Sequence, residues 1–139
     1  MPQTVNQVMT ADPRTVSPSD SVQDAARHMR DGDVGALVVV DNGTVSGIVT
    51  DRDIVVPAVA DGRDASGTTV KDVFTSSTVT VTPDQSASEA GRLMRERDIR
   101  RLVVVQDGRP VGIVSLGDLA VALDDESALA DISAASPNN

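Results

Sequence analysis

Two short segments of the sequence place a hydroxyl and a carboxylate where they can hold a polar ligand. Thr50 is followed three residues later by Asp53, and Ser115 is followed by Asp118 in the same way. A carboxylate can accept two hydrogen bonds from a ribose diol, and a hydroxyl next to a helix N-terminus favours a phosphate. The same spacing also fits a capping box, in which both side chains bind only the N–H groups that begin a helix. The residues alone leave both interpretations open.

Positive charge precedes only one of two similar Val-rich strands. Residues 99–101 are Ile-Arg-Arg, whereas the equivalent segment 34–36 is Val-Gly-Ala and carries no charge. The planar guanidinium suits phosphate oxygens. We therefore expect the site that uses the second segment, with Asp118, to bind a charged ligand better. It follows that Asp118→Ala should weaken binding more than Asp53→Ala does. The alternative is that both arginines pair with Asp98 or Glu96 on a solvated surface.

Both segments belong to one internal repeat. A shift of 65 residues aligns Val5–Ile54 with Val70–Leu119 without a gap, and 21 of the 50 aligned positions are identical. Such self-similarity indicates one supersecondary unit used twice. Because a unit of about 65 residues buries too little surface to be comfortably stable alone, the two copies should need each other.

Each copy predicts the order β-α-β-β-α. In the first copy, apolar residues recur at helical spacing from Val22, directly after helix-start signals. A buried strand then leads through an Asn-Gly hairpin turn to a second strand and a second helix. Continuous Val-rich strands imply sheets that helices cover on at least one face. The predicted segments are strands 36–40 and 45–49 with a helix near 51 in the first copy, and strands 102–105 and 111–114 with a helix near 117 in the second.

The polar segment between the copies marks a boundary. It contains Gly62 and Gly67 among small and charged residues, which is typical of a connecting loop. The small polar C-terminus is typical of a frayed end. The predicted divisions are repeat 1 at 5–62, a linker at 63–69, repeat 2 at 70–130 and a frayed tail at 131–139.

Composition and charge narrow the classes of function. The chain has 12 basic and 21 acidic residues, and the formal net charge of -9 argues against nucleic-acid and anionic-membrane partners. With no Cys and only His28, the sequence offers no metal-ligand cluster and no Ser-His-Asp or Cys-His arrangement. No secretory signal is visible, and no apolar run is long enough to span a bilayer. We expect a cytoplasmic protein that is not an enzyme, with no catalytic and no metal-binding residues.

The paired repeat and two signatures resemble a tandem pair of CBS domains, the Bateman-type module, as in small stand-alone CBS domain-containing proteins. The signatures are Gly47-Ile-Val-Thr50-Asp-Arg-Asp53 and Gly112-Ile-Val-Ser115-Leu-Gly-Asp118. The resemblance implies an α/β (α+β) fold in which two β-α-β-β-α repeats pack with pseudo-twofold symmetry. It also implies two clefts between the repeats, where many members bind adenosine nucleotides.

The resemblance assigns roles to residues. The aspartate of each signature holds the ribose hydroxyls, the Thr or Ser binds ribose or phosphate, the arginines contact phosphate, and the segments before each first helix contact adenine. For those last segments, ordinary packing at a sheet edge is the alternative. The nucleotide-binding positions implied in this way are Thr15, Val16, Val34, Thr50, Asp53, Thr80, Val81, Ile99, Arg100, Arg101, Ser115 and Asp118.

The resemblance also implies a function. We expect a regulatory, energy-sensing module that binds AMP, ADP, ATP or S-adenosylmethionine, with or without Mg²⁺, and uses no catalytic cofactor. Because no effector domain is visible in the sequence, the response should pass to another protein or through a homodimer. The alternative is a structural or protein-interaction CBS module with degenerate clefts that bind nothing, which the uncharged Gly35-Ala36 favours.

Overall fold

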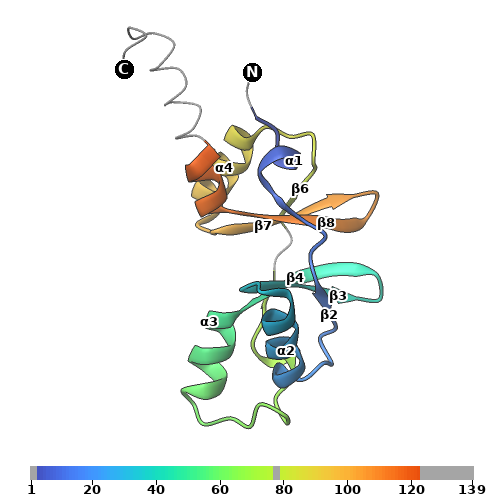
Figure 1. Ribbon diagram of the computed structural model, residues 1–139, viewed down its shortest axis with the longest axis vertical. Helices are drawn as coiled ribbons and strands as arrows, with labels where there is room; N and C mark the ends of the chain where they lie inside the picture. Colours follow the sequence, from blue (N-terminus) through green and yellow to red (C-terminus); the bar gives the residue numbers. More distant parts are fainter. Residues whose placement is uncertain (1–2, 77–78, 123–139) are drawn as a thin grey trace, which may run out of the picture.

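The protein is built from two sheets that lie face to face between outer helices. The computed structural model describes residues 3–76 and 79–122, and the tail predicted at 131–139 lies outside them. Figure 1 shows the layers along the long axis as helices, sheet, sheet and helices. The α/β (α+β) class with two repeat units, which the sequence predicts, is confirmed.

The first helix of each repeat begins and ends where the sequence signals predict. Helix α2 (Val22–Gly32) starts at Ser21, whose hydroxyl accepts a hydrogen bond from Asp24 N at 3.0 Å. Helix α4 (Ala87–Arg97) starts in the same way at Ser86. Each helix ends at an aspartate in the left-handed conformation, which short polar side chains tolerate. The two helices are therefore copies in structure as well as in sequence.

Each repeat contributes one antiparallel hairpin. Strand β3 (Ala36–Asp41) pairs with β4 (Thr44–Thr50), and β7 (Arg101–Gln106) pairs with β8 (Arg109–Ser115). The first turn has φ values of 51° at Asn42 and 80° at Gly43. Positive φ at both central residues is the type I′ geometry that matches the twist of the flanking strands. Short strands β2 (Thr15–Val16) and β6 (Thr80–Val81) add parallel to β3 and β7.

The segment that leads each repeat joins the sheet of the other repeat. Strand β1 (Thr10–Ala11) pairs with β8, and β5 (Thr75–Ser76) pairs with β4. The sheet orders are therefore β1-β8-β7-β6 and β2-β3-β4-β5. Short helices α1 (Val5–Val8) and η2 (Val70–Asp72) precede these strands. Because each repeat completes the other's sheet, neither can form its full sheet alone.

Alternation along the strands separates the core into three clusters. In β3, Leu37 and Val39 pack with residues of α2. Val38, between them, packs with Ile48 of its own repeat and with Val103 of the second repeat. All three β3 residues are fully buried. Burial of such a side chain contributes about 1.5–3 kcal/mol. The inter-sheet cluster around Val38 therefore holds the two repeats together.

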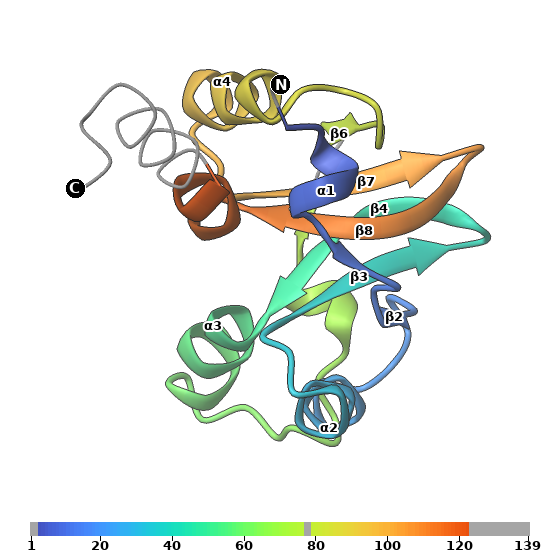
Figure 2. The ribbon, with the colours of Figure 1, turned by 45° about the horizontal axis from the view of Figure 1, so that its top comes forward.

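A second helix follows each hairpin. Helix α3 (Asp51–Ile54) continues into a π-helical turn, η1 (Val55–Val59), and residues 116–122 are helical after β8. In Figure 2 both segments lie on one side of the molecule, opposite the hairpin turns. Within the described residues, no helix is both long and apolar enough to cross a membrane.

Candidate functional site

Two clefts lie between the repeats and are related by the same 65-residue shift as the sequence. Cleft 1 has a volume of about 290 Å³ and cleft 2 of about 510 Å³. Cleft 1 is lined by Ile48, Thr50, Asp53, Thr75, Ser76, Asp98, Ile99, Arg100 and Arg101. Cleft 2 is lined by the nine equivalent positions, which are Thr10, Ala11, Asp33, Val34, Gly35, Ala36, Ile113, Ser115 and Asp118, and also by Asp12, Pro13, Arg14, Gly32 and Arg101.

Each cleft combines the strand-to-helix corner of one repeat with the start of the central strand of the other. Cleft 1 brings Asp53 of the first repeat to Arg100 and Arg101 of the second. The sequence groups these arginines with Asp118 instead, and the structure places only Arg101 in the cleft that holds Asp118. The reason is the face-to-face packing of the sheets, which sets the start of each central strand opposite the other repeat's corner.

Both corners form the predicted capping box. Thr50 N donates to Asp53 Oδ2 at 3.0 Å, and Asp53 N donates to Thr50 Oγ1 at 3.1 Å. Ser115 and Asp118 make the same two bonds, each at 3.0 Å. Each cap uses only one carboxylate oxygen; in the described part of the chain, no hydrogen bond involves the Oδ1 of either aspartate. Capping and ligand binding are thus compatible roles for these residues.

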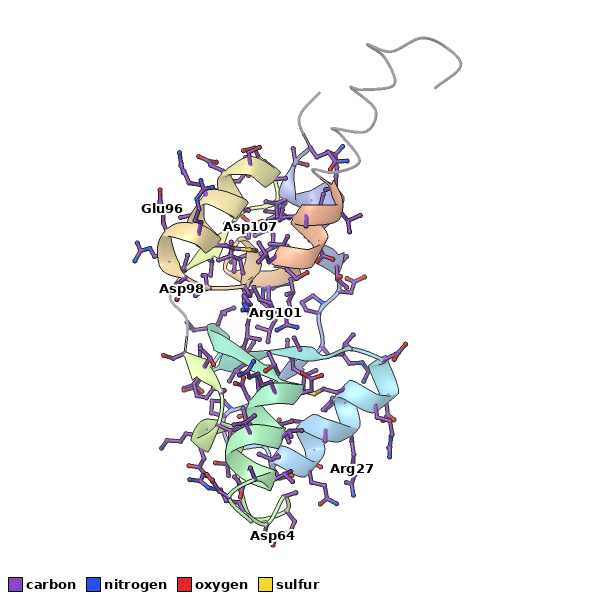
Figure 3. All side chains as sticks on the ribbon, turned by 90° about the vertical axis from the view of Figure 1, so that its left-hand side faces the viewer. Arg27, Asp64, Glu96, Asp98, Arg101 and Asp107 are labelled. Atoms are coloured by element: carbon purple, nitrogen blue, oxygen red, sulfur yellow. The ribbon has the colours of Figure 1, made fainter. Side chains whose placement is uncertain are left out.

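The two arginines of cleft 1 are available to a ligand. Among the residues that the structure describes, neither Arg100 nor Arg101 forms an ion pair, so the alternative that they pair with Asp98 or Glu96 is not seen. Glu96 instead lies 3.8 Å from Arg92 on the exposed face of α4. Figure 3 shows Arg101 between the two sheet layers and Asp98 at the edge of the second repeat.

Cleft 2 contains a cation that the sequence analysis missed. Arg14 lines this cleft, and its guanidinium packs where Gly32 leaves space, because a Cβ at position 32 would collide with the Arg14 side chain. Arg14 Nη1 lies 3.4 Å from His28 Nδ1. The repeat gives no signal for this contact, since the equivalents of Arg14 and Gly32 are Val79 and Arg97.

The predicted apolar and adenine contacts divide into two groups. Ile99 lines cleft 1 and Val34 lines cleft 2. Residues of strands β2 and β6 line neither cleft, since Val16 and Val81 are buried in the cores under the helices while Thr15 and Thr80 are exposed. These strands lie beside the central strands on the edge opposite β4 and β8. The clefts are bordered instead by the exchanged strands β1 and β5.

Polar groups outside the clefts have local roles. The Thr82 hydroxyl donates to Asp84 at 2.6 Å, and this bond lowers the pKa of the exposed Asp84 carboxyl in the turn before α4. Over the described residues, no group of three or more His, Cys, Asp or Glu side chains is arranged to hold a metal ion.

Known proteins share the sequence pattern and the architecture. The family model for the CBS domain matches residues 5–56 and 70–125. The CBS domain-containing protein YhcV of Bacillus subtilis is 43% identical over 125 residues, which is 89% of each chain. A solved structure of a protein with CBS domains from Burkholderia ambifaria is 36% identical, with a TM-score of 0.74, covering 87% of this chain and 93% of that one. A hexameric CBS-CP12 protein from bloom-forming cyanobacteria is 25% identical, with a TM-score of 0.77 and coverage of 96% and 90%.

Proposed function

The chain belongs to the CBS-domain family, and on this premise we propose that it is a cytoplasmic regulatory module that binds an adenosine nucleotide between its repeats. CBS pairs generally act as ligand-sensing or interaction modules. The proposed ligands are AMP, ADP, ATP or S-adenosylmethionine. The ligand is sensed and not transformed, so the proposal includes no catalytic step.

One observation carries the proposal. Cleft 1 gathers a carboxylate with an unoccupied oxygen, Asp53, and two arginines without an acidic partner among the described residues, Arg100 and Arg101. A ribose diol needs an acceptor pair, and a phosphate needs planar donors. The cleft volume of about 290 Å³ is near the lower end for ligand pockets, roughly 300–1,000 Å³. A nucleotide matches the chemistry of this lining.

The side chains suggest how a nucleotide lies in cleft 1. Asp53 Oδ1 accepts from the ribose hydroxyls, with the Thr50 hydroxyl beside it. The guanidinium groups of Arg100 and Arg101 bind the phosphates, and Ile99 gives the base an apolar surface. Each of these contacts crosses from one repeat to the other. A bound nucleotide therefore favours one relative setting of the repeats through its differential affinity for that setting.

Thermal unfolding with added nucleotides tests this proposal. An external dye is needed because the chain has neither Trp nor Tyr. Ligand at about 100 times its Kd adds roughly 2.7 kcal/mol, which raises the midpoint by several degrees for a domain of this size. We expect AMP, ADP, ATP or S-adenosylmethionine at millimolar concentration to raise it, and inorganic phosphate alone to leave it unchanged. No shift with any adenosine compound contradicts the proposal.

The alternative is an interaction module with degenerate clefts, and the charge of cleft 2 favours it for that site. Cleft 2 has two arginines but three aspartates, Asp12, Asp33 and Asp118. Under this alternative, the module acts through the exposed valines of η1 and of the helix that follows β8, which are Val55, Val56, Val59 and Val121. Phosphate release from ATP above the blank in a turnover assay would contradict both candidates, since neither is an enzyme.

A further inference from the structure

Arg101 has a position that no other lining residue shares. Of the described residues that line the two clefts, only Arg101 borders both. Arg100, its neighbour in sequence, lines cleft 1 and not cleft 2. One residue with a long, charged side chain therefore borders two separate ligand sites.

The strand pattern explains this position. Side chains alternate along β7, and Arg101 lies on the same face as Val103 and Val105, which pack between the sheets. Arg101 also faces Ser115 directly across the β7–β8 hairpin, at the corner that contributes to cleft 2. Across the inter-sheet layer it meets the corner of the first repeat, which contributes to cleft 1. Figure 3 shows Arg101 between the two layers.

The first repeat supplies no second copy of this charge. The position equivalent to Arg101 is Ala36, on the same inter-sheet face of β3. Without Arg101, cleft 2 keeps Arg14 alone against its three aspartates, and cleft 1 keeps Arg100 alone against Asp53 and Asp98. Arg101 therefore strengthens the binding of an anionic group in either cleft.

We propose that Arg101 couples the two clefts, so that a phosphate-bearing ligand in cleft 1 holds its guanidinium and weakens the binding of a second such ligand in cleft 2. The inference rests on the proposed nucleotide function and describes its regulation. A planar guanidinium binds one phosphate bidentately and cannot turn the same donors to another. The coupling is reciprocal, since either ligand reduces the affinity of the other by the same factor.

Isoleucine methyl NMR reads the two clefts separately. Ile48 and Ile99 line cleft 1, and Ile113 lines cleft 2. The probe is ADP without Mg²⁺, titrated into the full chain. In the wild type we expect the Ile99 signal to saturate at lower ADP concentration than the Ile113 signal. This order alone does not distinguish coupling from a difference in intrinsic affinity.

Blocking cleft 1 makes the distinction. The double variant Asp53→Ala with Arg100→Ala removes two groups that line cleft 1 only. Since typical allosteric couplings are about 5- to 150-fold, ADP should bind cleft 2 of this variant at least about fivefold more tightly than it binds cleft 2 of the wild type with cleft 1 filled. If this double variant does not fold, the milder double variant Asp53→Asn with Arg100→Gln takes its place in the experiment. The asparagine side chain at position 53 still offers an oxygen that accepts the hydrogen bond from Thr50 N.

The same comparison without Arg101 identifies the link. In an Arg101→Gln background, blocking cleft 1 should change the Ile113 titration by less than about twofold. An unchanged cleft 2 affinity on blocking cleft 1 overturns the coupling while the nucleotide function stands, and coupling that persists in Arg101→Gln overturns the role of Arg101. No response of any cleft isoleucine to ADP in the wild type overturns the nucleotide function and the coupling with it.

Discussion

At the scale of single residues, the structure reverses one expectation from the sequence, because each cleft combines residues from both repeats. Asp53 and Asp118 have the same capping bonds, but only Asp53 shares its cleft with both Arg100 and Arg101. We therefore expect Asp53→Ala to weaken the tighter ADP site more than Asp118→Ala does. Loss of a charged hydrogen-bonding group costs about 1.5–3 kcal/mol, which corresponds to about ten- to hundredfold in Kd.

Calorimetric titration of the two variants measures this difference. Each variant loses the same kind of hydrogen bond, from the backbone N–H of the N-cap residue to the aspartate, while the cap hydroxyl keeps its own bond, so the pair is matched in its cost to stability. A change in ADP affinity that follows from general destabilisation would appear equally in both. Equal losses, or a larger loss in Asp118→Ala, would show that Arg100 does not strengthen the site around Asp53.

The sequence predicts which residues form the sites better than it predicts which of them share a cleft. Thr50, Asp53 and the two arginines are visible in the sequence as types and spacings. A repeat aligned by a constant shift does not say which corner faces which strand, because that depends on how the two sheets pack. Arg14 left no signal, since its place depends on the missing side chain of Gly32.

At the scale of elements, the glycine of each signature has a steric reason. A Cβ at Gly47 would collide with the Thr75 carbonyl and lie 2.9 Å from Ser76 Cα. At Gly112 it would lie 3.0 Å from the Thr10 carbonyl. The exchanged strands β5 and β1 thus pair very closely with these glycines, where only a residue without a Cβ admits such close backbone approach. Because β5 and β1 border the clefts, the glycines position part of each site.

Substitution of Gly47 should therefore affect both stability and binding. We expect Gly47→Ala to displace β5, to cost about 1–3 kcal/mol of unfolding free energy, and to weaken ADP binding in cleft 1, which Thr75 and Ser76 line. Urea unfolding and the Ile99 methyl titration measure the two effects. The control is Gly108→Asn, because Gly108 has φ of 77° and a Cβ there meets nothing within 4 Å. Wild-type stability and ADP binding in Gly47→Ala would mean that the close contact with Gly47 does not position β5.

Some elements follow from local sequence and others do not. The helices after Ser21 and Ser86 and the Asn42-Gly43 turn are where caps, periodicity and turn chemistry predict them. The exchanged strands β1 and β5 are two residues long, too short for alternation to indicate a strand or a partner. Their pairing is decided by tertiary packing of α1 and η2 against the opposite repeat, through bonds such as Val5 N to Gln85 O at 2.8 Å and Val70 N to Asp20 O at 2.8 Å.

At the scale of the whole molecule, the helices that follow the hairpins expose an apolar surface. Val55, Val56 and Val59 of η1 are 56%, 53% and 61% exposed, and Val121 is 61% exposed. Val56 and Val121 are equivalent positions of the repeat, and Figures 1 and 2 show their two helices on the same side of the molecule. Clustered exposed apolar side chains of this kind mark interaction sites.

We propose a second copy of the chain as the partner for this surface, because two equivalent patches related by a pseudo-twofold axis can meet the same two patches of a partner in a closed dimer. We expect Val56→Glu with Val121→Glu to dissociate the homodimer. Each of the two changed residues occurs twice in such an interface, and loss of about 1.5 kcal/mol at each of the four side chains weakens dimerisation by about ten-thousandfold. Because these side chains are exposed in the single chain, its own unfolding free energy should change by less than about 0.5 kcal/mol for each substitution.

Sedimentation velocity over a range of protein concentrations measures the effect, with Thr44→Glu at an exposed hairpin end as the control. The wild type and the control should sediment as dimers at concentrations at which the double variant sediments as a monomer.

Adding ADP to the wild type then tests whether the clefts and this surface communicate. If ADP at concentrations that saturate the cleft isoleucine signals of both proteins changes the sedimentation of the wild type but not of Arg101→Gln, the ligand signal reaches the surface through the inter-sheet layer. A wild type that is monomeric at every concentration would leave the exposed valines for a different protein, and would contradict the homodimer.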